Sequence, residues 1–168
     1  MVKYFLESSA FIKRYKPEDG SQIVDALFKS GNELFCLNLA IMEIYKVFYR
    51  LWKYPLQQDV RQGVRLTEAE FCKLKARFAA DLLIVRRVEF TEEMIYRSGE
   101  ILDRIWLRSV FDLAHLTAYM VVREEYGDVI FVCSDVRSHL VDAARVLYGE
   151  EQVLVPERVK FSGGCFLD

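Results

Sequence analysis

Four acidic residues stand in stretches of the sequence that are otherwise apolar. Glu7 directly follows the run V-K-Y-F-L, and Asp135 follows V-I-F-V-C after one intervening residue. Glu43 borders the apolar stripe of a predicted helix, and Asp112 is the only formal charge in the run S-V-F-D-L-A-H-L-T-A-Y-M-V-V. Carboxylates beside a hydrophobic core are costly unless they are paired or bind a cation. These four residues are therefore the candidates for chemistry.

A shared metal ion is the chemistry that four such acids would best support. If they converge, repulsion and lost hydration raise the pKa of one or more of them unless a counter-ion is present. The four cysteines form no C-x-x-C pair and there are only two histidines, so an oxygen-only ligand set favours Mg²⁺ or Mn²⁺ over zinc. Two such ions about 3.5–4 Å apart would activate a water and stabilise the leaving oxygen in phosphodiester cleavage.

Each acid also has a structural explanation, which the sequence leaves open. Glu7 and Asp135 could cap the helices that follow them. Asp112 could be a first-turn acid that responds to its helix dipole. Glu43 could pair with Lys46, three residues later on the same helix.

Other polar residues near these acids are expected to play supporting roles. Ser8 and Ser134 each adjoin one of the acids, and both are suited to capping helices. A hydroxyl beside a metal-binding acid can also orient it. His115 fits a hydrogen-bonded core residue better than a metal ligand.

Short apolar runs alternate with longer segments of helical periodicity, which is typical of an α/β/α sandwich with a central, mostly parallel sheet. The predicted strands are 2–6, 33–37, 82–85 with a possible extension to 88, 129–133 and 152–155. The predicted helices are 10–15, 21–29, 39–54, 71–80, 92–105, 111–126 and 136–147. Ligands of such sheets bind beyond the carboxyl ends of the strands, so we expect the four acids to meet there.

Composition favours one domain over residues 1–157, with residues 158–168 as a flexible tail. The chain has 168 residues, of which 52% are hydrophobic and 29% charged, enough for a substantial core. Lys3 and Glu7 interrupt any signal-peptide pattern, and no uncharged run is long enough to span a membrane. We therefore expect a cytoplasmic protein that makes no membrane contact.

Four motifs in order resemble those of PIN-domain nucleases, in particular the toxin ribonucleases of VapBC modules. The first is Y-F-L-E-S-S-A-F-I-K-R-Y (4–15), and the second is L-N-L-A-I-M-E-I (37–44). The third is F-D-L-A-H-L-T-A (111–118), and the last is C-S-D-V-R-S-H-L-V-D-A-A-R-V-L-Y-G (133–149). Each motif is weakly specific alone, but together they cover most of the chain.

This resemblance implies a metal-dependent endoribonuclease with a PIN-like fold that cleaves single-stranded or structured RNA and acts as the toxin of a toxin–antitoxin module. It implies that Mg²⁺ or Mn²⁺ is held by Glu7, Glu43, Asp112 and Asp135. In that scheme Glu43 helps to place a second ion or the attacking water. It also implies an RNA substrate, a cognate antitoxin whose segment covers the active-site groove, and a homodimer.

Glu7 departs from the family pattern, which has Asp at that position. One added methylene displaces the carboxylate, and a shift of about 1 Å can lower a rate by on the order of a hundredfold. We therefore expect weakened catalysis. The alternative is a PIN-like RNA-binding or protein-interaction module without activity.

Basic residues suggest where RNA could lie. Residues 50–79 hold seven basic and three acidic side chains, which could guide phosphates toward the acids. The RNA-contact candidates are Lys13, Arg14, Arg50 and Lys53. An ordinary solvated helical face explains the basic region equally well.

Overall fold

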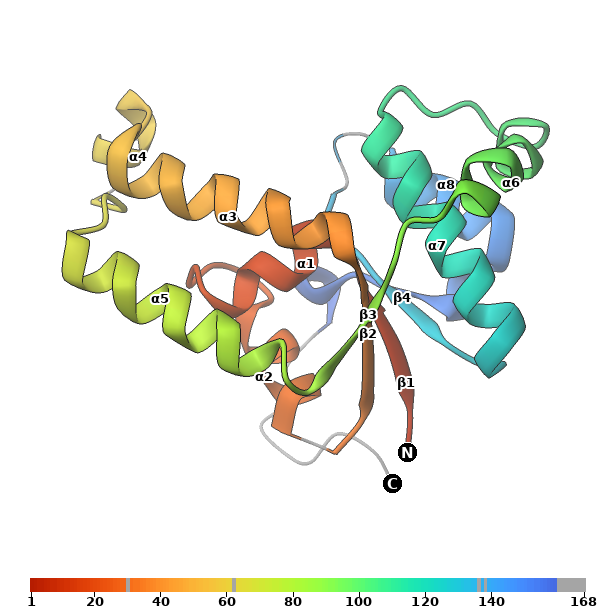
Figure 1. The fold of residues 1–168 in the computed structure, drawn as a ribbon, viewed down its shortest axis with the longest axis horizontal. Coiled ribbons are helices and arrows are strands. Elements are labelled where there is room, and N and C mark those ends of the chain that lie inside the picture. The colour runs from red at the N-terminus through yellow and green to blue at the C-terminus, as the bar shows by residue number, and fades with distance from the viewer. Residues whose placement is uncertain (30, 62, 136, 138, 160–168) are drawn as a thin grey trace.

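A central sheet of five parallel strands organises the chain (Figure 1). The computed structural model describes residues 1–29, 31–61, 63–135, 137 and 139–159. The strand order is β3-β2-β1-β4-β5, and every pairing is parallel. The strands are β1 (Lys3–Leu6), β2 (Glu33–Leu37), β3 (Val85–Val88), β4 (Ile130–Val132) and β5 (Val153–Leu154). The predicted α/β class is confirmed, and the sheet is wholly rather than mostly parallel.

The sheet is buried on both faces because its central strands are apolar throughout. In β1, successive side chains point to opposite faces: Phe5 belongs to one core cluster, while Tyr4 and Leu6 belong to the other. Continuous apolar strands of this kind are typical of parallel sheets covered by helices on each side.

Two groups of helices cover the two faces. One face packs against α1 (Ser8–Phe11), α2 (Ser21–Lys29), α3 (Asn38–Lys53) and α5 (Glu68–Asp81). The other packs against α6 (Glu92–Leu102), α7 (Val110–Tyr126) and α8 (Leu140–Tyr148). The predicted α/β/α sandwich therefore matches the structure. No helix among the described residues is long and apolar enough to cross a membrane.

Helices α3 and α5 run side by side away from the sheet, and α4 (Gln57–Arg61) lies at their far end (Figure 1). A capping box starts α5: the Thr67 side chain accepts from the Glu70 backbone, and the Glu70 side chain accepts from the Thr67 backbone. This reciprocal bonding satisfies two backbone donors that a helix start otherwise leaves without partners.

Several predicted boundaries differ from the structure. Residues 82–84 are turns, and the third strand occupies the end of the predicted run. The first helix tightens after one turn into the 3₁₀ segment η1 (Ile12–Arg14), and α4 lies between the predicted helices 39–54 and 71–80, where no helix was expected. Short 3₁₀ segments η2 (Glu150–Gln152) and η3 (Pro156–Arg158) flank β5. The predicted tail falls mainly on 160–168, outside the described residues.

Candidate metal-binding site

Glu7 lies at the carboxyl end of β1, where its side chain is almost enclosed. The residue is 4% exposed. Its carboxylate caps α1 by accepting from the Ser9 N–H at 2.9 Å and from the Ser9 hydroxyl. It also accepts from Ser8 Oγ at 2.6 Å. The capping role considered from the sequence is therefore real, and the same hydrogen bonds fix the carboxylate in place.

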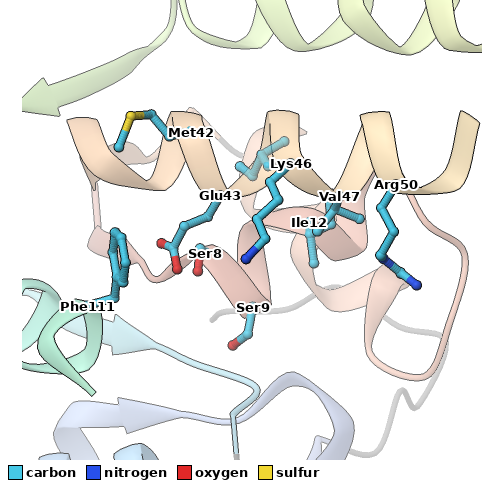
Figure 2. Close-up of a pocket in the computed structure, with 10 residues that line it drawn as sticks. Ser8, Ser9, Ile12, Met42, Glu43, Lys46, Val47, Arg50 and Phe111 are labelled. Carbon is cyan, nitrogen blue, oxygen red and sulfur yellow. The ribbon is translucent and has the colours of Figure 1, made fainter. Parts of the chain in front are cut away.

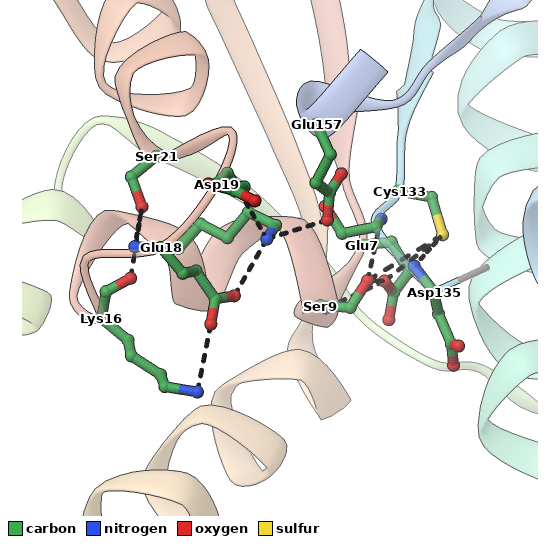
Figure 3. Close-up of polar contacts among 11 residues, drawn as sticks. Glu7, Ser9, Lys16, Glu18, Asp19, Ser21, Cys133, Asp135 and Glu157 are labelled. Atoms are coloured by element: carbon green, nitrogen blue, oxygen red, sulfur yellow. Dashed lines mark hydrogen bonds and ion pairs between the residues drawn. The ribbon is translucent and has the colours of Figure 1, made fainter. Parts of the chain in front are cut away.

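The carboxyl end of β4 is tied to this carboxylate through Cys133 (Figure 3). The Cys133 thiol donates to Glu7 Oε2 at 3.6 Å and accepts from the Asp135 N–H at 3.4 Å. Burial and then the charge of Glu7 raise the pKa of this thiol well above its usual range, so it remains a donor. The Ser134 N–H completes the connection by donating to Ser9 Oγ at 3.0 Å.

Glu43 reaches the same place from α3, where it meets His115 of α7. The distance between His115 Nε2 and Glu43 Oε2 is 2.8 Å, and Nε2 lies 3.8 Å from Glu7 Oε1. His115 is only 1% exposed. The sequence expectation of a hydrogen-bonded, buried histidine agrees with this placement, although its carboxylate partner was not foreseen.

The neighbouring carboxylates change the titration of His115. Burial by itself lowers the pKa of the imidazole, because the charged form loses its hydration. The hydrogen bond that the ring donates to Glu43 and the charges of three carboxylates, Glu7, Glu43 and Asp112, outweigh burial and raise the pKa of His115 above its ordinary value. A protonated His115 would be a cation held among these three carboxylates.

Glu7, Glu43 and His115 together could hold a metal ion. One ligand atom from each can be chosen so that all three lie within 4.8 Å of one another. Carboxylate oxygens suit Mg²⁺ and Mn²⁺, whereas an imidazole nitrogen favours Mn²⁺ and later transition ions over Mg²⁺. The donor set therefore fits a divalent cation, but it is not the oxygen-only set expected from the sequence.

Asp112 and Asp135 lie beside this group of three rather than within it. Asp112 is 9% exposed, in the first turn of α7, and its charge acts on His115. Asp135 is half-buried, accepts from the Arg137 N–H at 3.1 Å and acts electrostatically on Cys133. All four predicted acids thus lie at one end of the sheet. Glu43 and Asp112 are on the His115 side of Glu7, and Asp135 is on the Cys133 side.

The basic RNA-contact candidates are placed differently from one another. Lys13 is 5% exposed and bridges Glu18 and Glu157, while Arg14 pairs with Asp25 and Asp81. These ion pairs hold both cations against carboxylates of the protein itself. On α3, Arg50 pairs with Asp59, and Lys53 is exposed over the Trp52 ring.

A cavity of about 430 Å³ opens beside the acids, between α1 and α3 (Figure 2). Glu43, Lys46 and Arg50 line it from α3, and Ser8 and Ser9 line it from α1. Phe111 of α7 closes the end nearest Glu43. The remaining lining side chains are apolar: Ile12, Met42, Ile44 and Val47. We call this cavity the α3 groove.

The fold is shared with a solved structure, although no protein-family model and no curated protein matches the sequence. That structure is VapBC2 from Rickettsia felis, bound to a DNA fragment from the promoter. The match has a TM-score of 0.52 and 11% sequence identity, and it covers 82% of this chain and 90% of that one. At this identity the likeness establishes the architecture: an all-parallel α/β sandwich consistent with a PIN-like fold.

Proposed function

We propose that this protein is a divalent-metal-dependent endoribonuclease and the toxin of a toxin–antitoxin module. The observation that carries the proposal is the meeting of Glu7, Glu43 and His115 at the carboxyl edge of the sheet, with Asp112 and Asp135 beside them. Perturbed, buried titratable groups next to a groove are typical of active sites. The likeness to VapBC2 and the four PIN-like motifs support the same class of reaction.

In the proposed site, each side chain has a distinct task. Glu7, Glu43 and His115 would hold the ion, and Asp112 and Asp135 would complete its surroundings or bind a second ion. A divalent ion at such a site lowers the pKa of water and stabilises charge on phosphate oxygens. The hydroxyls of Ser8 and Ser9 hold Glu7, and Glu43, oriented by His115, would position the attacking water.

Removing the charges of Asp112 or Asp135 tests this assignment. D112N and D135N are nearly isosteric, so each should retain the fold while lowering RNA cleavage with Mn²⁺ by about a hundredfold or more. Cleavage would be followed on a labelled single-stranded RNA, and folding by circular dichroism and thermal melting. D142N, on the exposed side of α8, is the matched control and should keep full activity. Retained cleavage in both site variants would refute the assignment.

Glu7 allows the strength of catalysis to be tested separately. We expect E7D to raise the cleavage rate with Mn²⁺, because the shorter side chain restores the reach of the acid in the family pattern. An unchanged or lower rate would show that the hydrogen bonds to Ser8, Ser9 and Cys133 already place the Glu7 carboxylate where catalysis needs it.

A PIN-like RNA-binding or interaction module without catalysis is the second candidate. It is favoured because the Glu7 carboxylate already has hydrogen-bond donors within the chain: it accepts from both serines and from the Cys133 thiol. This alternative predicts RNA binding that persists in EDTA and no cleavage product at any Mn²⁺ concentration. Our preferred proposal predicts product that disappears when EDTA is added.

The proposed biological setting is a cytoplasmic toxin that acts on RNA. Its antitoxin would cover the α3 groove and exclude the substrate, and the toxin would form a homodimer. Copurification with the product of a neighbouring gene, followed by restored cleavage after that partner is removed, tests the antitoxin. Light scattering of the isolated chain tests the dimer.

A further inference from the structure

Lys46 lies in the α3 groove, three residues after Glu43, and is exposed. Its ammonium and the Glu43 carboxylate project from the same side of α3 toward α1 (Figure 2). Among the residues that the structure describes, none forms an ion pair or hydrogen bond with Lys46. Among the described residues, the groove therefore contains a cation that makes no direct contact with a carboxylate.

The usual partner for Lys46 is taken by another residue. Acid and lysine three residues apart on a helix commonly pair, and the sequence allows Glu43 to pair with Lys46. In the structure Glu43 instead contacts His115 at 2.8 Å. The third groove-lining charge on α3, Arg50, is held by Asp59, whose side chain is 5% exposed. Among the described residues that line the groove, Lys46 is thus the cation without an ion-pair partner.

Lys46 is placed to bind the RNA phosphate next to the one that is cleaved. With a rise of 1.5 Å per residue, Lys46 lies about 4.5 Å and Arg50 about 10.5 Å along the helix axis from Glu43. The Ser8 and Ser9 hydroxyls lie across the groove. A polyanion along α3 would meet the metal-binding acids first, then Lys46, then Arg50.

Phe111 favours an RNA strand whose bases are unpaired. Its ring is 44% exposed and lines the groove at the Glu43 end. An exposed aromatic ring can stack on a free base, a contact worth about 1–3 kcal/mol per base. In a duplex the bases are already stacked on one another and are not available to such a ring.

We propose that Lys46 binds a phosphate adjacent to the scissile one and that Phe111 stacks on an unpaired base, so that the RNA backbone lies along α3 from Phe111 toward Arg50. This inference rests on the proposed nuclease function. It assigns Lys46 as a substrate-binding residue and Phe111 as a base-stacking residue, and it makes the α3 groove the path of the RNA backbone.

Binding of a labelled single-stranded RNA in EDTA, measured by fluorescence anisotropy over a range of KCl concentrations, tests the proposal without cleavage. K46Q should weaken binding about tenfold and reduce the slope of log affinity against log salt by about 0.7, the value for one lost contact to a single strand. K46R should retain most of the affinity. F111A should weaken binding with an unchanged salt slope, because stacking involves no phosphate.

The matched control is K29Q, which makes the same charge change on an exposed lysine at the end of α2, just before β2 begins. It should leave affinity and slope unchanged. Equal effects of K46Q and K29Q would overturn the proposal, as would duplex RNA binding as tightly as the single strand. Single-stranded DNA must lose the same factor in K46Q, since a phosphate contact does not sense the 2′-hydroxyl.

The two proposals fail in different ways. If the wild-type protein cleaves RNA but K46Q binds it as K29Q does, the path along α3 is wrong and the nuclease function stands. If the wild-type protein neither binds nor cleaves RNA, the proposed function itself is wrong.

Discussion

Two groups of charged side chains include residues close together near the start of the chain, Glu7 in one and Lys13 in the other, and their charges are balanced differently. The paired network comprises Lys13, Arg14, Tyr15, Glu18, Asp25, Asp81 and Glu157. In it, Asp81 accepts from Arg14 Nε at 2.7 Å and from the Tyr15 hydroxyl at 2.7 Å. The acid cluster comprises Glu7, Glu43 and His115, with two carboxylates and one titratable base.

The difference separates a structural use of charge from a functional one. In the paired network Lys13 and Arg14 have fixed partners from distant segments, so the network joins η1 to α2, α5 and η3. In the acid cluster the only internal cation is His115, which can lose its proton. The first arrangement should stabilise the fold without added ions, whereas the second should respond to an added ion.

Breaking the paired network should have the largest effect on stability. R14M removes the guanidinium that forks onto Asp81, whose side chain is 8% exposed. An uncompensated buried carboxylate typically costs about 3–5 kcal/mol, so urea unfolding should show a loss of that size. R77M is the control, since Arg77 contacts Asp25 at 3.3 Å and is 46% exposed; it should cost less than about 1 kcal/mol. Equal losses would contradict the distinction.

Adding Mn²⁺ should stabilise the protein through the acid cluster. A ligand at 100 times its dissociation constant adds about 2.7 kcal/mol to the free energy of unfolding, measured by denaturation with and without the ion. E43Q should lose most of this increment because it removes a ligand. E18Q, a change within the paired network, should keep it. An increment that is absent from the wild type would contradict the metal site.

The two groups should respond to pH with opposite signs. The raised pKa of His115 means that, without metal, its stabilising contribution is complete below the unfolded value of 6.5 and is lost as pH rises through the folded value. The slope is at most about 1.4 kcal/mol per pH unit. Burial alone would raise the pKa of Glu18, but the hydrogen bonds and charges of its lysine partners lower it. The contribution of Glu18 to stability is therefore present above the unfolded value of 4.5 and is lost as the pH falls through the folded value.

Unfolding in EDTA from pH 5.5 to 9 measures the His115 effect as the difference between the wild type and H115Q. H139Q is the control, because His139 is exposed. A difference between the wild type and H115Q that grows with rising pH would contradict the raised pKa.

The smallest expected effect is a gain in stability on removing a site carboxylate. D135N keeps an oxygen that can accept from the Arg137 N–H but removes a charge that, like that of Glu7, acts on the Cys133 thiol. In EDTA we expect up to about 1 kcal/mol of stabilisation, since repulsion among like charges is relieved. D142N on α8 should change stability by less than about 0.5 kcal/mol. Destabilisation by D135N would indicate that its charge is already balanced within the chain.

Much of the framework could be predicted from local patterns. Strand 33–37, helix 21–29 and the start of the predicted helix 92–105 agree with the structure, because apolar runs and helical periodicity act within a few residues. Asn38 shows where such reasoning fails. It looks like a helix cap, but it lies inside α3 and accepts from the Phe90 N–H at 3.3 Å. A distant donor satisfied the side chain instead of a local one.

The sequence by itself determined which carboxylates lie at the ends of strands, because each of these acids directly follows or nearly follows an apolar run in the chain. It could not determine their partners. His115 lies 72 positions from Glu43, and Asp81 lies 67 from Arg14. Such pairs depend on how each helix is rotated and packed on the sheet, which local periodicity does not encode. Tertiary packing therefore decided that Glu43 contacts a histidine, that Arg14 is enclosed by acids, and that Lys46 faces the groove without an ion-pair partner among the described residues.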